Sequence, residues 1–263
     1  MSLLSNLFHN KKLIKSLVRR DIVAAYFGSI FGNTWVVVDP LINILITLIF
    51  FQFAIKSSNP ENVPYAAWVL PAIIFWSFIS LAINSTINSI KEYSFLLRHK
   101  SIDMRLIVVI KILAAAIVHL ILLLILLALL WILYGIKFNY YTFLLIYYLL
   151  AMSFLIFGMG LLISSLGAFL KDTRNFVAIF IQLEFWTSPI FWEPDRFPKA
   201  VALIMKLNPF YYPIHGYRQA VLASPFGSDF ALQTTYFWIV VIAIYFFGNW
   251  VFTKLSPAFG DVT

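Results

Sequence analysis

The sequence contains no cysteine among its 263 residues, and only 11% of its residues are charged. The lack of cysteine excludes disulfide bonds and thiol chemistry in any compartment. The four histidines, His9, His99, His119 and His215, are too far apart in the sequence to form a metal-binding motif, so no metal ligand is assigned. Together with a mean hydropathy of +0.91, the shortage of charge excludes an ordinary soluble domain.

Two kinds of catalytic motif are also missing. No Gly-x-x-x-x-Gly-Lys-Ser/Thr sequence occurs, so the chain cannot bind nucleotide phosphates through a P-loop, and it is not predicted to be an enzyme. The 11 acidic residues are spread along the chain and do not form the cluster that a membrane glycosyltransferase or a lipid-modifying enzyme needs. A proton-coupled secondary transporter is a remote alternative, because it requires paired titratable groups and usually an internal repeat.

The sequence is instead rich in long apolar runs, and 62% of its residues are hydrophobic. A membrane span takes about 20 mostly apolar residues. Because lipid offers the backbone no hydrogen-bond partner, each run is predicted to be a helix. The predicted fold is an all-α integral membrane protein whose six transmembrane helices occupy about 34–55, 66–90, 106–134, 141–168, 175–192 and 234–253.

Two further segments are predicted to be helical without crossing the bilayer. Residues 4–27 carry apolar residues on one side and basic residues largely on the other, which is typical of an amphipathic helix in the membrane interface. The proline-rich segment before span six is predicted to form two short external or re-entrant helices, with Pro209 and Pro213 in the bend. The predicted parts are a cytoplasmic N-terminus at 1–33, a transmembrane domain at 34–253 that includes a cytoplasmic segment at 91–105 and an external segment at 193–233, and a cytoplasmic tail at 254–263.

The distribution of basic residues predicts the orientation of the chain. The net charge of +8 could indicate a nucleic-acid partner, but the lysines and arginines flank the apolar runs, so no nucleic acid is predicted. If the N-terminus is inside, a minority of the 19 basic residues fall outside, namely Lys56, Lys137, Arg196, Lys199, Lys206 and Arg218. We therefore expect both termini to lie in the cytoplasm.

The polar segment at 91–105 carries apolar residues at helical spacing among its charges. A plain solvated loop, which is the alternative, would leave these apolar side chains exposed without purpose. We predict a coupling helix that binds a soluble partner, with the apolar residues as anchors and the charges setting the register. The residues assigned to this contact are Glu92, Tyr93, Phe95, Leu96, Leu97, Arg98 and Asp103. Lys171 and Asp172 are predicted to form a second contact, and a plain turn is the alternative there.

Aromatic residues make up 18% of the chain and gather near the ends of spans two and five. Interfacial belts and core packing explain a large share of them. Others are predicted to line a conduit, because the C–H face of a sugar ring stacks on an aromatic ring without requiring one particular sequence. The conduit candidates are Trp35, Phe75, Trp76, Phe78, Glu184, Phe185, Trp186, Trp192 and Tyr211.

Several polar or small residues inside the spans have individual predictions. Glu184 lies deep in span five and is predicted to contact substrate, another span or a second copy of the chain. Asp39 is predicted to cap or to pair with a basic residue of the amphipathic helix. The polar stretch at 84–88 indicates interhelical hydrogen bonds or a pore face, and Gly158 and Gly160 indicate close helix packing.

Several short motifs occur in a fixed order along the chain. They are Arg20-Asp21-Ile22, the run from Tyr26 to Trp35 ahead of Pro40, Leu170-Lys171-Asp172-Thr173-Arg174-Asn175, Ser188-Pro189-Ile190-Phe191, Leu207-Asn208-Pro209-Phe210 and His215-Gly216-Tyr217-Arg218. In order and spacing they resemble the permease subunits of ABC transporters that export O-antigen, capsule or teichoic acid. The resemblance covers essentially the whole chain.

This resemblance implies a homodimer of the chain joined to two ATPase subunits, in the inner membrane of a bacterium and surrounded by membrane lipids. The chain itself would bind no cofactor, because ATP and Mg would belong to the partner ATPase. The implied function is the export of a lipid-linked polysaccharide of the O-antigen type. Capsule, teichoic acid, a small lipid or a drug are alternative substrates within the same superfamily.

Overall fold

The computed structural model describes residues 6, 9–24, 34–53, 63–98, 102–137, 139–224 and 229–261, and their regular elements are all helices. The predicted all-α class is therefore confirmed for the described residues. The α-helices are α2 (Lys11–Ala24), α3 (Trp35–Phe53), α4 (Tyr65–Thr86), α5 (Ser89–Glu92), α6 (Arg105–Tyr134), α7 (Leu144–Phe169), α8 (Thr173–Thr187), α9 (Lys199–Leu207), α10 (Tyr211–Leu222) and α11 (Phe230–Leu255). Short 3-10 turns are η2 (Ser94–Arg98), η3 (Tyr140–Phe143), η4 (Pro194–Arg196) and η5 (Ser256–Asp261).

Four helical stretches of the described chain are long and apolar enough to cross a membrane. They are Tyr65–Thr86, Arg105–Tyr134, Tyr140–Phe169 and Phe230–Gly260. They correspond to the predicted spans two, three, four and six. The predicted count of six spans is not confirmed, because α3 is not among these four stretches and α8, with 15 residues, is shorter than they are.

The predicted fifth span is wrong at its end. Helix α8 stops at Thr187, whereas the prediction continued to residue 192. Pro189 disfavours helical geometry for the residue before it, and Ser188 is extended with φ −76° and ψ 157°. The chain from Ser188 to Glu193 is therefore a loop that turns away from the end of α8.

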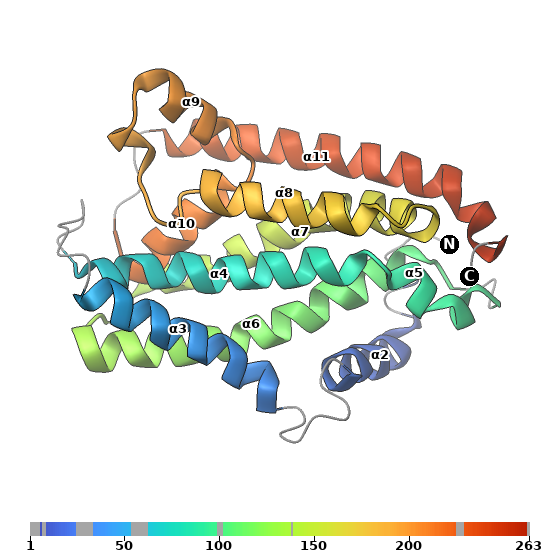
Figure 1. The fold of residues 1–263 in the computed structure, drawn as a ribbon, viewed down its shortest axis with the longest axis horizontal. Coiled ribbons are helices and arrows are strands. Elements are labelled where there is room, and N and C mark those ends of the chain that lie inside the picture. Colours follow the sequence, from blue (N-terminus) through green and yellow to red (C-terminus); the bar gives the residue numbers. More distant parts are fainter. Residues whose placement is uncertain are drawn as a thin grey trace.

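The long helices run along a common axis and the short ones lie at its ends (Figure 1). Helices α2 and α5 and the C-terminal end of α11 lie at one end, while α9 and α10 lie at the other. Helix α4 is central, because 78% of its apolar stretch is buried by α3, α6, α7 and α10. Helix α11 is peripheral, with 11% of its stretch buried, and it packs mainly against α7.

The centre of the bundle is an aromatic stack between α4, α6 and α10. The rings of Phe75 and Tyr217 are parallel, with centroids 4.1 Å apart. His119 of α6 shares a hydrogen bond of 2.9 Å with the Tyr217 hydroxyl. A Cβ atom on Gly216 would lie 2.2 Å from the ring of Tyr148, so a glycine there permits α10 to approach α7.

The predicted close packing at two glycines is confirmed. A Cβ atom on Gly158 of α7 would lie 2.8 Å from the backbone nitrogen of Tyr245 on α11, and one on Gly160 would lie 2.7 Å from Val108 on α6. The α7–α11 contact also needs Gly248, whose Cβ would lie 2.1 Å from the carbonyl oxygen of Gly158. Small residues let the backbones of membrane helices approach closely, and this contact gains its dispersion energy in that way.

The predicted interfacial helix corresponds to α2 within the described residues. Its Leu17 and Val18 are buried against α6, while Lys12 and Lys15 are exposed. The prediction reached from 4 to 27, and its flanks at 4–5, 7–8 and 25–27 lie outside the described residues, as does the side chain of Asp39.

The two short helices predicted before span six are present as α9 and α10. The bend between them contains Asn208 and Pro209, as expected. Pro213 was wrongly placed in this bend, because it lies in the first turn of α10. A proline there costs little, since the first backbone N–H groups of a helix have no partner within the helix.

Candidate functional site

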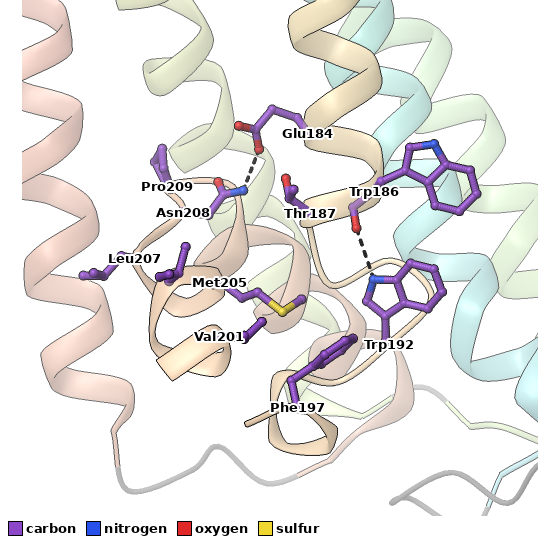
Figure 2. Close-up of a pocket in the computed structure, with 11 residues that line it drawn as sticks. Glu184, Trp186, Thr187, Trp192, Phe197, Val201, Met205, Leu207, Asn208 and Pro209 are labelled. Atoms are coloured by element: carbon purple, nitrogen blue, oxygen red, sulfur yellow. Dashed lines mark hydrogen bonds between the residues drawn. The ribbon is translucent and has the colours of Figure 1, made fainter. Parts of the chain in front are cut away.

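A pocket of about 570 Å³ lies between the end of α8 and α9, and Figure 2 shows most of its lining. We call it the α8–α9 pocket. The indole rings of Trp186 and Trp192 are nearly parallel, with centroids 5.9 Å apart, and the Trp192 Nε1 donates to the carbonyl of Trp186 over 3.1 Å. The lining consists of Glu184, Trp186, Thr187, Trp192, Phe197, Val201, Ile204, Met205, Leu207, Asn208 and Pro209.

A carboxylate and an amide supply the polar part of this pocket. The Asn208 Nδ2 donates to the Glu184 Oε2 over 2.5 Å, and the Asn208 Oδ1 accepts from the backbone N–H of Phe210 at the start of α10 over 2.8 Å. The partner that the structure gives Glu184 is therefore a residue of the bend after α9 and not a residue of another span, and contact with substrate or with a second copy stays a prediction. The bend residue Asn208 links α8 to α10 and places the acid at the pocket wall.

A second cavity of about 640 Å³ lies between α3, α4 and α8, and we call it the α3–α8 cleft. Phe50, Trp76, Phe185 and Phe191 form its aromatic part. Helix α4 supplies another part of the lining. Its polar members Ser77, Ser80 and Asn84 recur at a spacing that places them on one helix face. The residues from α4 are Ile73, Ile74, Trp76, Ser77, Ser80, Leu81 and Asn84.

The polar stretch at 84–88 divides between two uses. Asn84 lines the α3–α8 cleft, so its side chain lies at a cavity, as a residue of the predicted pore face would. The hydroxyls of Ser85 and Thr86 donate to carbonyl oxygens of their own helix, over 2.8 Å and 2.7 Å. These two hydroxyls therefore make their hydrogen bonds within their own helix, whereas the prediction named hydrogen bonds between helices as one use of this stretch.

The conduit candidates fall into three groups. Glu184, Trp186 and Trp192 line the α8–α9 pocket, while Trp76 and Phe185 line the α3–α8 cleft. Trp35, at the start of α3, is part-exposed and is not among the residues that line either cavity.

Three further candidates line neither cavity in this structure and are buried in the protein core. Phe75 and Phe78 are at most 1% exposed, stack on each other and contact the tilted ring of His119. Tyr211 is 3% exposed and stacks on His215. Sequence alone did not separate these rings from the lining ones, since each lies in an apolar helix.

The sequence prediction assigned no role to Arg218, which positions the aromatic loop of both cavities. Its guanidinium carbon lies 3.6 Å from the centroid of the Trp68 ring, and its Nη1 donates to the Glu193 Oε1 over 3.1 Å. Its Nη2 donates to the carbonyls of Pro189 and Ile190. An arginine within an apolar helix is a signal that could have identified it, because such a charge needs buried partners.

The predicted coupling segment at the opposite end of the bundle is folded onto the protein itself. Tyr93 and Leu96 are 0% and 3% exposed, so in this arrangement they pack within the chain, and their role in binding a partner stays a prediction. Phe95 is 44% exposed and Glu92 is also exposed, so these side chains are available at the surface. The side chains of Leu97 and Arg98 lie outside the described residues.

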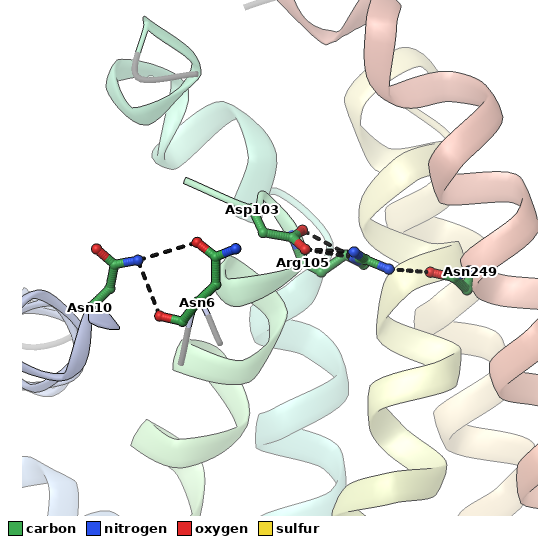
Figure 3. Close-up of polar contacts among 5 residues, drawn as sticks. All are labelled: Asn6, Asn10, Asp103, Arg105 and Asn249. Atoms are coloured by element: carbon green, nitrogen blue, oxygen red, sulfur yellow. Dashed lines mark hydrogen bonds and ion pairs between the residues drawn. The ribbon is translucent and has the colours of Figure 1, made fainter. Parts of the chain in front are cut away.

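The other predicted contact residues lie near the same end of the bundle. Asp103 binds Arg105 over 2.6 Å, and Arg105 in turn donates to the Asn249 Oδ1 over 3.0 Å, so this pair ties α6 to α11 (Figure 3). Lys171 and Asp172 are exposed in the turn between α7 and α8. Their role in binding a partner stays a prediction.

An all-helical bundle with four apolar helices of membrane-spanning length defines a multi-pass membrane protein. Among the described residues, no three His, Asp or Glu side chains form a group that could hold a metal ion. Residues 12–222 match the family model of the ABC-2 type transporter, and the chain belongs to this family. The match is to the membrane domain of these transporters, and no ATPase domain is found in the chain. Permeases of the ABC-2 family function with ATPase subunits.

One curated protein with a similar stretch of sequence is a permease of an O-antigen export system. A stretch of 90 residues is 26% identical to the O-antigen export system permease protein RfbA of Myxococcus xanthus. The alignment covers 34% of this chain and 34% of that protein, so about a third of the relative's length is matched.

Proposed function

We propose that this chain is the membrane subunit of an exporter that moves a lipid-linked polysaccharide of the O-antigen type across a bacterial inner membrane. Two copies of the chain would form the conduit, and two separate ATPase subunits would bind ATP and Mg. The observation that carries the proposal is the pair of aromatic cavities on the two sides of α8. The similarity to the RfbA permease supports the substrate class.

Aromatic cavities with little charge suit a sliding glycan. Tryptophan faces bind the C–H surface of a sugar ring by stacking, and such contacts are worth roughly 0.5–1.5 kcal/mol each beyond area burial. Glu184 and Asn208 add hydrogen-bonding groups for hydroxyls at the edge of the α8–α9 pocket. Many weak contacts of this kind hold a repeating polymer without stopping its movement.

A six-span arrangement is supported by the direction of the helices. Helix α8 runs along the same axis as the longer helices, and α3 lies obliquely against α4 (Figure 1). The outward side of α8 is a continuous apolar stripe of exposed residues at helical spacing, which suits contact with lipid or with a second copy. The stripe consists of Phe176, Ile179, Leu183 and Trp186.

The proposed energy input comes from the end of the bundle that holds α2 and α5. An ATPase subunit would contact Phe95 and Glu92 of the coupling segment, and Lys171 and Asp172 would form the second contact. ATP-driven closure of the two ATPases would push these segments and open the conduit. With this end in the cytoplasm, both termini are cytoplasmic, as the distribution of basic residues indicates.

Export by tryptophan variants tests the proposal. The chain and its ATPase are reconstituted in vesicles with lipid-linked polysaccharide, and the rate of ATP-dependent export is measured. Trp186→Ala and Trp192→Ala should each lower the rate by about 2- to 12-fold, which corresponds to the loss of one stacking contact of roughly 0.5–1.5 kcal/mol. Trp186→Phe should retain most of the rate, because a ring remains.

The matched control is Trp250→Ala, which removes an exposed ring of α11 that is not among the residues lining either cavity. Thermal unfolding is measured for every variant, so that loss of folding is not read as loss of transport. Normal export by well-folded Trp186 and Trp192 alanine variants would contradict the glycan conduit. Normal glycan export with loss of small-lipid transport would favour the lipid alternative.

A further inference from the structure

Lys111, in the second turn of α6, joins three elements that are distant in the sequence. Its side chain is 8% exposed, and its Nζ lies 3.0 Å from the Asp21 Oδ2 of α2 and 2.6 Å from the Glu92 Oε2 of α5. A buried lysine needs paired charges, and here the two carboxylates come from two different segments. The three helices are therefore tied at one ammonium group.

We call the ion-pair network of Lys111, Asp21 and Glu92 the joint. Tyr93 of the coupling segment strengthens it. The Tyr93 hydroxyl donates to the Asp21 Oδ1 over 2.6 Å. Burial of the phenol, and next the hydrogen bond to Asp21, raise the pKa of Tyr93, so the hydroxyl stays protonated and remains a donor. Asp21 thus receives Lys111 on one oxygen and Tyr93 on the other.

Arg20 extends the contact to the surface of η2. Its guanidinium carbon lies 4.3 Å from the centroid of the Tyr93 ring and 5.1 Å from that of Phe95. The Phe95 ring is 44% exposed, so one side of it is free while the other contacts α2. A push on Phe95 would reach α2 through Arg20 and α6 through Tyr93, Asp21 and Lys111.

We propose that Lys111 is a positioning residue that fastens α2, the α5–η2 segment and the start of α6 into one unit, so that displacement of α5–η2 by an ATPase carries α2 and α6 with it. This inference rests on the proposed contact of α5–η2 with the ATPase. Apolar packing of α2 on α6 alone would let the helix slide, because dispersion contacts are not directional. The ion pairs and the hydrogen bond fix its position.

Distance measurements between spin labels test whether the three elements move together. The chain has no native cysteine, so labels can be placed on exposed sites through Ser16→Cys in α2, Lys91→Cys in α5 and Lys254→Cys in α11. The permease–ATPase complex in lipid nanodiscs is compared without nucleotide and with ATP and orthovanadate. The Lys91–Lys254 distance should change on trapping, while the Ser16–Lys91 distance should stay constant.

Removal of the joint should separate its mechanical role from its structural role. Lys111→Met leaves Asp21 buried without its ion pair and should lower the unfolding temperature. Asp21→Asn combined with Lys111→Met removes the two shielded charges and should recover the unfolding temperature, because the remaining Glu92 side chain is 49% exposed and can be hydrated. We expect this double variant to hydrolyse ATP but to export at least fivefold less substrate per ATP, with a broadened Ser16–Lys91 distance. Lys12→Met, an exposed change on α2, should match the parent protein in all readouts.

The proposal is overturned if the stable double variant exports as much per ATP as the parent, because the network would then be merely structural. It is also overturned if the Ser16–Lys91 distance changes on trapping in the parent, or if α5 does not move against α11. Phe95→Asp tests the proposed ATPase contact separately, because it alters the exposed ring without changing Lys111. Normal coupling in that variant would count against the contact, while the Ser16–Lys91 distance still reports on the joint.

Discussion

Arg218 lies where an unpaired charge would be costly, since its side chain is 1% exposed. Its partners are Glu193, two backbone carbonyls and the face of Trp68. A planar guanidinium can serve all of them at once, because its five donors form a fixed fork and its face stacks on a ring. Arg218 therefore helps to hold the loop that follows α8, together with the Tyr65 hydroxyl, which donates to the carbonyl of Phe191.

Substitution of Arg218 by lysine should therefore destabilise the protein although the charge is kept. One ammonium cannot reach Glu193 and both carbonyls while covering Trp68. Breaking a buried pair of this kind costs about 3–5 kcal/mol, so we expect a clearly lower unfolding temperature in detergent. Lys199→Arg on the exposed side of α9 is the control and should leave the temperature unchanged. Equal stability of the two variants would show that the Arg218 contacts are not needed.

At the scale of elements, the contact between α7 and α11 depends on backbone approach. Gly158 and Gly248 face each other across the two helices, and Gly248 leaves no room for a Cβ atom against the Gly158 carbonyl. Since most of the remaining surface of α11 is exposed, this contact is the main one that fixes the helix in the described chain. The α11 position is therefore sensitive to a single methyl group.

Gly248→Ala should push α11 away from α7 and destabilise the protein by about 1–3 kcal/mol, the usual cost of an overpacked core. Gly260→Ala is a matched control, because a Cβ atom there would meet nothing within 4 Å. Both variants are compared by thermal unfolding in detergent. If Gly248→Ala unfolds at the temperature of Gly260→Ala, the helices do not depend on this close approach.

At the scale of the whole molecule, the two ends of the bundle have different roles in the proposal. The end with α2, α5 and the turn between α7 and α8 carries the segments proposed to meet the ATPase, while α9 and α10 lie at the other (Figure 1). Basic residues are concentrated on α2 and around the coupling segment, and the proposed cytoplasmic position of the first end rests on this distribution.

Cysteine labelling tests this orientation on a chain that has no native cysteine. Single cysteines at Asn139 and Asp195 should react with an impermeant thiol reagent in cells whose outer barrier has been opened. Cysteines at Lys15 and Lys171 should react only after the inner membrane is permeabilised. The opposite pattern would invert the topology, and labelling of all four sites from outside would contradict a membrane-crossing bundle.

Sequence by itself determined the helical class, the amphipathic helix α2 and the close packing at Gly158. Each follows from local rules, because a long apolar run in lipid must satisfy its backbone as a helix and an amphipathic pattern defines its own buried face. The resemblance to polysaccharide-exporting ABC permeases also came from local motifs, and the ABC-2 family match agrees with it at the level of the transporter superfamily.

Only the tertiary structure decided which side chains are available to a ligand or a partner. Phe75 is buried on Tyr217 while Trp186 lines a pocket, although both lie in apolar helices. An apolar span has no polar face to mark its orientation, so neighbouring helices decide which rings they cover. The pairing of Lys111 with Asp21 was equally hidden, because it joins residues far apart in the sequence and arises only when α2 packs on α6.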